Sequence, residues 1–249
     1  MKPIAIRGKA AAYPLICAPL VGADRNALLA EAKAAVKAGA DIVEWRIDFF
    51  RDFSSAIQAG RALREVLSGM PLLLTRRSVA EGGQPVSVSE KDIVDLYREA
   101  CVAGFADLVD YEMSNDEADI KAVREAARRN GVGLVCSFHD FERTPPLAEL
   151  ASRFRRAQEL GGDVAKVAVM ARNAEDVLTL LAATQQASKT LELPLIAISM
   201  GPQGALSRSI GFAFGSALTF GVASAGSAPG QMPIGELRRA IEIARKALG

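Results

Sequence analysis

The segment GGDVAKVAVM, residues 161–170, consists mostly of small and β-branched apolar residues, with one lysine, Lys166, near its middle. A short apolar run that follows a pair of glycines is typical of a strand that a parallel sheet buries on both faces. Burial removes water from an ammonium group and favours the neutral amine, which can form a Schiff base with a ketone or an aldehyde. The alternative is a lysine at the end of a strand that extends its charge into water.

Short apolar segments of this kind alternate with longer, alanine-rich and charged segments along the whole chain. We expect strands at residues 14–20, 41–48, 71–77, 107–112, 132–139, 163–170, 194–200 and 218–223. We expect helices at residues 24–38, 54–67, 89–103, 115–130, 146–160, 173–191, 205–215 and 233–248. Eight strand–helix units of roughly thirty residues each match the size of a (β/α)8 TIM barrel.

Residue types at the ends of the expected helices fit this division. Helix-starting residues are expected at Asp24, Ser89, Asn115 and Asn173, and helix-ending glycines at Gly39, Gly69, Gly104, Gly131 and Gly161. No proline- or serine-rich linker divides the chain, so we expect residues 1–249 to form a single TIM-barrel catalytic domain. The alternative, a doubly wound open sheet, would favour a G-x-G-x-x-G turn after the first strand, and the sequence lacks that motif.

The composition excludes several classes of partner. The chain has 30 Lys and Arg against 29 Asp and Glu, so its net charge does not indicate binding to nucleic acid or to an anionic membrane. No apolar run approaches transmembrane length, and the first thirteen residues, Met1 to Tyr13, lack the apolar core of a signal peptide. Three scattered cysteines and a single histidine fit neither a disulfide framework nor a zinc site. We therefore expect a cytoplasmic protein.

Charged residues recur at alternate positions of the expected strands. Glu44, Arg46 and Asp48 share one face of the second strand, while the apolar residues between them face the helices. The same alternation directs toward the barrel interior Thr75, Arg77, Asp110, Glu112, Ser137, His139 and Lys166. Most of these lie near the carboxyl ends of the strands, where barrel enzymes build active sites. An internal ion pair between Glu44 and Arg46 is the alternative for those two residues, but polar groups on five strands favour a site.

Seven short motifs occur in order along the chain. They are VEWRID at 43–48, RSVAEGG at 77–83, SFHDF at 137–141 with TP at 144–145, KVAVM at 166–170, MG at 200–201 with LSR at 206–208, FGSALTFG at 214–221, and SAPGQ at 227–231. With these motifs the chain resembles the type I 3-dehydroquinate dehydratases, the Schiff-base-forming enzymes of the shikimate pathway. Phe138, Ala171 and Ile198 depart from residues that are common in the family.

The resemblance implies dehydration of 3-dehydroquinate to 3-dehydroshikimate by a homodimer that needs neither a metal nor an organic cofactor. Lys166 matches the family's Schiff-base lysine, His139 its general base and acid, and Glu81 the carboxylate that orients the histidine. Arg208 matches the residue that binds the substrate carboxylate. The resemblance also implies a pocket lined by Glu44, Arg46, Arg77 and Met200, and a mobile loop that contributes Ser227, Ala228 and Gln231.

Without the resemblance, simpler interpretations stay open. His139 could be a neutral histidine satisfied inside the barrel, Glu81 a polar loop residue, and Arg208 a helix-surface arginine. The loop at 226–231 could be an ordinary surface turn. Two other functions also remain: a class I aldolase, with residues 201–204 as a weak phosphate site, and an inactive barrel that serves as a scaffold. The scaffold predicts loss of Lys166 or His139, and both are present.

Overall fold

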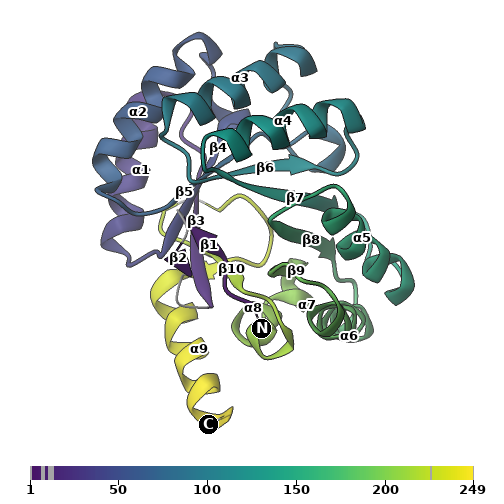
Figure 1. Cartoon of the computed structure of the whole chain (residues 1–249). Helices are drawn as coiled ribbons and strands as arrows, with labels where there is room; N and C mark the ends of the chain where they lie inside the picture. The colour runs from purple at the N-terminus through teal and green to yellow at the C-terminus, as the bar shows by residue number, and fades with distance from the viewer. Residues whose placement is uncertain (1, 7–8, 11–13, 225, 249) are drawn as a thin grey trace.

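The computed structural model describes residues 2–6, 9–10, 14–224 and 226–248. Parallel strands pair in chain order and curl into a barrel (Figure 1). The strands are β3 (Leu15–Leu20), β4 (Ile42–Arg46), β5 (Leu72–Thr75), β6 (Leu108–Glu112), β7 (Gly133–Asp140), β8 (Val164–Met170), β9 (Leu195–Met200) and β10 (Leu218–Val222). β10 pairs with β3, and a single bridge between Leu195 and Ser216 joins β9 to the segment that enters β10. The chain thus adopts the predicted TIM-barrel fold.

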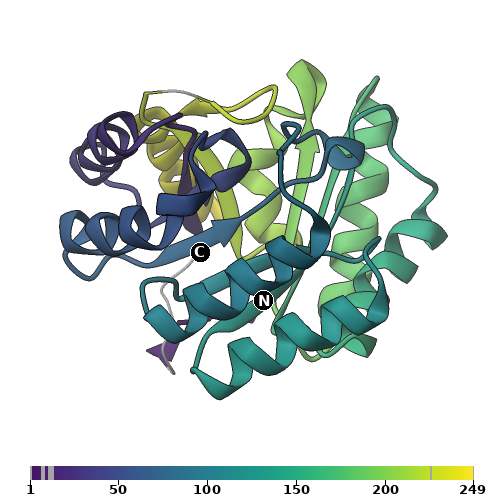
Figure 2. The same cartoon turned by 90° about the horizontal axis from the view of Figure 1, so that it is seen from above.

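Helices surround the strands on the outside of the barrel (Figures 1 and 2). They are α1 (Arg25–Lys37), α2 (Ala56–Leu67), α3 (Glu90–Ala103), α4 (Glu117–Arg129), α5 (Leu147–Glu159), α6 (Ala174–Thr190), α7 (Gly201–Gly204), α8 (Ser207–Ile210) and α9 (Ile234–Leu248). Shorter elements are β1 (Ala5–Ile6), β2 (Lys9–Ala10), β11 (Met232–Pro233) and the 3-10 turns η1 (Ile47–Phe49), η2 (Phe53–Ser55), η3 (Val79–Glu81) and η4 (Gly211–Phe214). Every expected strand is present, with bounds that differ by a few residues.

The continuous helix predicted at 205–215 is wrong. Two short pieces, α8 and η4, take its place, and α7 precedes them. The segment winds as a short α-helix followed by a 3-10 turn, and Gly215 ends it with a φ of 116°, which other residues rarely adopt. The short strands β1, β2 and β11 were not predicted. The β1–β2 hairpin lies near the middle of the barrel in Figure 1, and Ile4 beside it is buried among the apolar residues of the barrel interior.

The predicted helix ends are largely confirmed. Asp24, Ser89 and Asn173 each accept a hydrogen bond from a backbone N–H in the first turn of the helix that follows. The five predicted helix-ending glycines all have positive φ. Asn115 is wrong as a helix start: the chain turns one residue later, and the N–H groups of Asp119 and Ile120 both donate to the carbonyl of Asp116.

Inside the barrel, side chains form layers because residues two apart on a strand share a face. The lowest layer is apolar and consists of Ile42, Leu73, Leu108, Val135 and Val164. Two residues further along the same five strands lies a polar layer that consists of Glu44, Thr75, Asp110, Ser137 and Lys166. The residues between them pack outward against the helices, so the predicted assignment of faces agrees with the structure. The apolar layer closes the bottom of the barrel and confines the charges to its carboxyl end.

In the described ranges, no helix has the length and apolarity needed to cross a bilayer. Cys17, Cys101 and Cys136 are free thiols and are buried. No signal peptide is expected in the segment from Met1 to Tyr13. Both of these end residues lie outside the described residues.

Helix α2 approaches the loop before β6 so closely that only glycine fits at one position. A Cβ atom on Gly60 would lie 2.5 to 2.6 Å from three ring carbons of Phe105, whose ring also packs beside Trp45. We predict that Gly60→Ala lowers the free energy of unfolding by about 1–2 kcal/mol, because overpacking outweighs the gain in helix propensity. Chemical denaturation measures this change.

Gly235 in α9 provides the matched control, since it is exposed and a Cβ there would meet no atom within 4 Å. Gly235→Ala should raise the free energy of unfolding by about 0.5 kcal/mol. A Gly60→Ala protein as stable as the wild type would show that the contact with Phe105 does not constrain the packing.

Candidate active site

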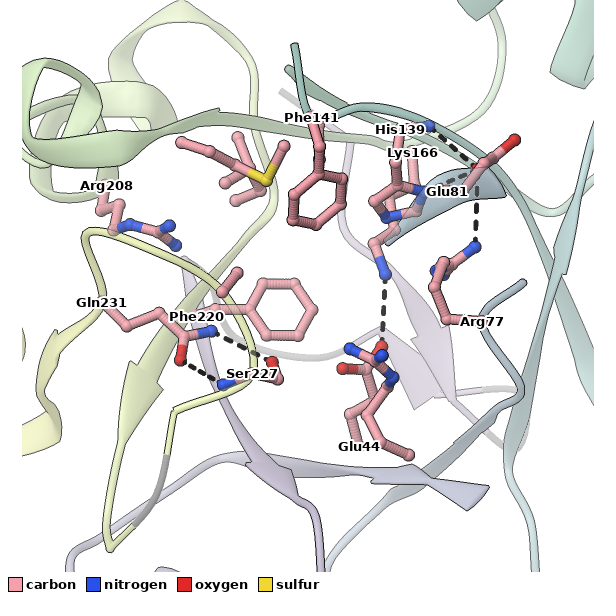
Figure 3. Close-up of a pocket in the computed structure, with 15 residues that line it drawn as sticks. Glu44, Arg77, Glu81, His139, Phe141, Lys166, Arg208, Phe220, Ser227 and Gln231 are labelled. Carbon is pink, nitrogen blue, oxygen red and sulfur yellow. Dashed lines mark hydrogen bonds and ion pairs between the residues drawn. The ribbon is translucent and has the colours of Figure 1, made fainter. Parts of the chain in front are cut away.

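A cavity opens at the carboxyl ends of the strands, above the polar layer. It is lined by all eleven residues that the resemblance to the family implies: Glu44, Arg46, Arg77, Glu81, His139, Lys166, Met200, Arg208, Ser227, Ala228 and Gln231. Figure 3 shows the labelled side chains around the cavity, with Lys166 and His139 on one side and Arg208 on the other. Segments that are far apart in the sequence therefore meet in one place.

Lys166 extends from β8 into the barrel and is only 4% exposed. Its Nζ donates to Asp110 Oδ2 at 2.8 Å and to Glu44 Oε1 at 3.2 Å, and it lies 5.1 Å from the centroid of the Phe220 ring. The alternative of a lysine that reaches into water is therefore wrong. Loss of hydration was the only effect expected on the amine. In the structure, two carboxylates beside Nζ also compensate its buried charge.

Asp110 connects Lys166 to a second buried cation. Its Oδ1 accepts from Arg77 Nη2 at 2.7 Å and from the hydroxyl of Ser137 at 2.6 Å. Burial disfavours an ionised carboxylate, but Arg77 and Lys166 outweigh that effect and lower the pKa of Asp110 to about 2. Asp110 is thus a carboxylate at neutral pH. Arg77 also donates to Glu112 Oε1 at 3.0 Å, so each of these buried charges has an opposite partner.

The alternative of an internal ion pair between Glu44 and Arg46 is wrong. Arg46 instead makes a bidentate ion pair with Asp48, with two N–O distances of 2.8 Å. Glu44 accepts from the hydroxyl of Thr75 at 2.9 Å and from Lys166. The two carboxylates thus have different partners, and Glu44 lies beside the amine.

Glu81 holds the imidazole of His139 in place. The carboxylate Oε2 lies 2.9 Å from His139 Nδ1 and accepts from the backbone N–H of His139 at 3.0 Å, while Oε1 accepts from the hydroxyl of Ser114 at 2.8 Å. Glu81 ends the turn η3, and Gly82 follows it with a φ of 84°. Because Nδ1 faces the carboxylate, Nε2 is the nitrogen available to a molecule in the cavity. Glu81 and His139 therefore form an oriented pair.

The surroundings of this pair disfavour extra charge. Burial lowers the pKa of His139 well below its usual value, and the nearby cations Arg77, Lys166 and Arg46 lower it further. Burial raises the pKa of Glu81 to about 7; Glu112 adds to this effect and Arg77 opposes it. Near neutral pH the imidazole is therefore a neutral base. A neutral His139 imidazole beside Glu81 suits a base that takes up a proton briefly and passes it on.

Arg208 lies on the opposite wall of the cavity, on α8. It is only 3% exposed, which excludes a helix-surface arginine. Nη2 donates to the carbonyl of Pro229 at 2.9 Å, whereas Nε and Nη1 are buried with no partner among the described residues. Burial lowers the pKa of Arg208 to about 10, so the guanidinium stays charged at neutral pH. A buried cation with unpaired donors is costly, and an anion in the cavity would compensate its charge and accept a hydrogen bond from it.

The loop between β10 and β11 borders the cavity. The backbone N–H of Ser227 donates to Gln231 Oε1 at 3.0 Å, and Gln231 Nε2 donates to the Ser227 hydroxyl at 3.4 Å (Figure 3). The loop contacts the rest of the barrel through Pro229, whose carbonyl accepts from Arg208 and from the N–H of Gly201 at 3.4 Å. These contacts connect the loop to the site, unlike those of an ordinary surface turn.

Three further residues line the cavity, namely Phe141, Ala168 and Phe220. The sequence contains a signal for each, because they lie two residues after His139, Lys166 and Leu218 and so share the inward face. Ile198 also lines the cavity, and with Met200, which the resemblance implies, it completes the apolar wall. Phe138 faces outward, where Arg153 lies 4.3 Å from its ring centroid. Within the described part of the chain, no three His, Cys, Asp or Glu residues are grouped to hold a metal.

Comparisons with known proteins agree with this geometry. The family model of type I 3-dehydroquinase matches residues 16–247. The 3-dehydroquinate dehydratase of Albidiferax ferrireducens is 49% identical over 254 residues, which cover 100% of this chain and 96% of that protein. The crystal structure of 3-dehydroquinate dehydratase from Geobacillus kaustophilus has a TM-score of 0.95 at 41% identity, covering 98% of this chain and 97% of the other.

The type I 3-dehydroquinate dehydratase of Clostridium difficile, solved with covalent modified comenic acid, has a TM-score of 0.93 at 38% identity. It covers 99% of this chain and 100% of the other. Each of these relatives is covered over at least 96% of its length, and the family model matches almost all of the chain. The chain belongs to the type I 3-dehydroquinase family.

Proposed function

We propose that this protein dehydrates 3-dehydroquinate to 3-dehydroshikimate through a Schiff base on Lys166, with His139 as the general base and acid. One observation carries the proposal: the cavity has a buried amine and an oriented imidazole on one side and a guanidinium with unpaired donors on the other. A ring that bears a ketone and a carboxylate fits such a cavity, because each group has a partner there. The relatives named 3-dehydroquinate dehydratase support the choice of substrate.

The chemistry starts at the amine. Glu44 Oε1, 3.2 Å from Nζ, can accept the proton that the ammonium must lose before it attacks. The amine then adds to the ketone of the substrate, and water leaves as the iminium forms. The iminium withdraws electrons more strongly than the ketone, so the carbon beside it loses a proton more readily.

His139 would carry that proton. Its neutral imidazole takes the proton from the carbon, and the imidazolium then gives it to the departing hydroxyl group, which leaves as water. Glu81, 2.9 Å from Nδ1, stabilises the imidazolium in between. Hydrolysis of the iminium consumes one water and frees Lys166, so the net reaction removes one water from the substrate.

The other residues would hold the substrate and exclude solvent. Arg208 binds the carboxylate through a guanidinium nitrogen that has no partner among the described residues, while Glu44, Arg46 and Arg77 contact the hydroxyl groups or fix the groups that do. Met200, with Phe220, provides an apolar wall. Ser227, Ala228 and Gln231 close the cavity when their loop covers the substrate, which keeps water from the iminium.

We also propose that residues 1–249 act as one catalytic domain in a cytoplasmic homodimer that uses no cofactor. The match over almost the full length of the relatives supports the first part of this proposal. Membership of the family disfavours the aldolase and the inactive scaffold. Lys166 and His139, which a scaffold need not retain, both line the cavity.

Chemical trapping tests the Schiff base. Incubation with 3-dehydroquinate followed by borohydride should inactivate the protein irreversibly, because reduction converts the iminium to a stable amine. Peptide mass mapping should locate the adduct on Lys166, and Lys166→Met should form none. An adduct on another lysine, or activity that survives the treatment, would contradict the mechanism.

A second prediction concerns His139. His139→Ala should keep the fold and lose turnover by about 10²–10⁴-fold, as expected when a general base is removed. The variant should still be trapped on Lys166 by borohydride, since the amine remains. Steady-state rates and circular dichroism test both points. Turnover within a few-fold of the wild type would end the assignment.

A third prediction is the pH dependence of kcat/KM. Because the pKa of Glu81 is raised to about 7, its carboxylate form is present above that pH and is lost as the pH falls. A protonated Glu81 no longer stabilises the imidazolium, so kcat/KM should decline below about pH 7. Glu81→Gln should lower the plateau and abolish this acid limb. An unchanged acid limb in that variant would assign the titration to another group.

A further inference from the structure

Three consecutive backbone N–H groups follow the end of β5, and each donates to a side chain from a different part of the chain. Arg76 N–H donates to the Tyr97 hydroxyl at 2.8 Å, Arg77 N–H to Asp48 Oδ1 at 3.3 Å, and Ser78 N–H to Glu112 Oε1 at 2.7 Å. This segment carries the Arg77 side chain into the cavity and leads to the turn that holds Glu81. Its course therefore determines where two site residues lie.

Tyr97 is the member of this set that comes from outside the barrel. It belongs to α3, is 1% exposed, and its hydroxyl also donates to the backbone carbonyl of Asp110 at 2.7 Å. Thr75 is the last residue of β5 and pairs with Asp110 of β6. One buried hydroxyl thus bridges the two strands at the point where they separate, and it satisfies a donor on one strand and an acceptor on the other.

One bridged residue, Asp110, contacts the Lys166 amine, and the other, Arg76, precedes a second partner of Asp110. Asp110 accepts from Lys166 at 2.8 Å through Oδ2 and from Arg77 at 2.7 Å through Oδ1. Arg77 follows Arg76, whose N–H the hydroxyl binds. A change in the spacing of these strand ends would move the carboxylate relative to both cations. Small displacements of this kind reduce rates strongly when reacting groups must be aligned.

We propose that Tyr97 is a positioning residue whose hydroxyl fixes Asp110 and Arg77 and thereby aligns Lys166 for Schiff-base formation. This inference rests on the proposed function of Lys166. Tyr97 does not line the cavity, so it acts through the two strands and not by contact with the substrate. The hydroxyl binds only main-chain atoms of the two strands, so it fixes the backbone positions of Arg76 and Asp110.

Tyr111 provides a matched control. Its ring is also buried and packs edge-on against that of Tyr97, with centroids 5.5 Å apart. Its hydroxyl donates to Glu90 Oε1 on α3 at 2.7 Å, and Glu90 pairs with the Arg76 side chain at 2.9 Å, so this hydroxyl binds no main-chain atom of either strand. Tyr97→Phe and Tyr111→Phe therefore remove the same atom from the same layer between α3 and β6, and they differ in whether the strand ends lose their bridge.

The experiment compares kcat, KM, the rate of borohydride trapping on Lys166 and the melting temperature in the wild type and both variants. Tyr97→Phe should lower kcat and the trapping rate by about tenfold and change KM by less than about twofold, because Arg208 lies on the opposite wall. Tyr111→Phe should stay within about twofold of the wild type in all three kinetic quantities. Circular dichroism reports the folded fraction of each protein.

A double-mutant cycle with Arg77→Lys separates positioning from a general loss of stability. If Tyr97 acts through Arg77 and its partner Asp110, Tyr97→Phe should cost less than about threefold in kcat when Arg77→Lys is already present. Independent, multiplicative effects would overturn the inference. So would a loss of kcat in Tyr97→Phe that the loss of folded protein explains completely, or equal rates for the two tyrosine variants.

The wild type distinguishes this inference from the function on which it rests. Turnover and trapping on Lys166 in the wild type, together with an unaffected Tyr97→Phe, would overturn the role of Tyr97 alone. A wild type that is not trapped on Lys166 would overturn the proposed function and this inference with it.

Discussion

Asp110 holds two cations at once inside the barrel, and the position of the buried amine depends on that arrangement. A carboxylate between Lys166 and Arg77 compensates charges that would otherwise cost several kcal/mol each in the interior. Glu44 and Glu112 extend the same pattern, so the charges on this side of the cavity are paired before a substrate arrives. Fixed dipoles and charges of this kind need little reorganisation during a reaction.

The opposite wall of the cavity is organised differently. Arg208 is as buried as Lys166, yet two of its nitrogens have no partner among the described residues. Its remaining nitrogen binds the carbonyl of Pro229, which belongs to the loop that borders the cavity. An anion that satisfies Arg208 would therefore lie beside the loop as well as across from the amine. This asymmetry, with one wall complete and the other incomplete, favours a substrate that carries a negative group.

Alternation along strands is the reason that so much of the site could be predicted from the sequence. Residues two apart share a face, so Glu44, Arg46 and His139 could be directed inward without coordinates. The choice of ionic partners could not be predicted, because alternation does not show which of the charged side chains on one face meet. Arg46 pairs with Asp48, which lies where the chain leaves β4 in the turn η1, and not with Glu44. The Tyr97 bridge was hidden for a similar reason, since helix α3 gives no sign of which strand ends it reaches.

A crystal structure of the borohydride-reduced complex with 3-dehydroquinate would test most directly whether Lys166 is the reactive amine. We expect continuous electron density from Nζ of Lys166 to a ring carbon of the ligand. We also expect the ligand carboxylate within hydrogen-bond distance of the Arg208 guanidinium. A ligand bound without a covalent bond, or attached to a different side chain, would show that Lys166 is not the reactive amine.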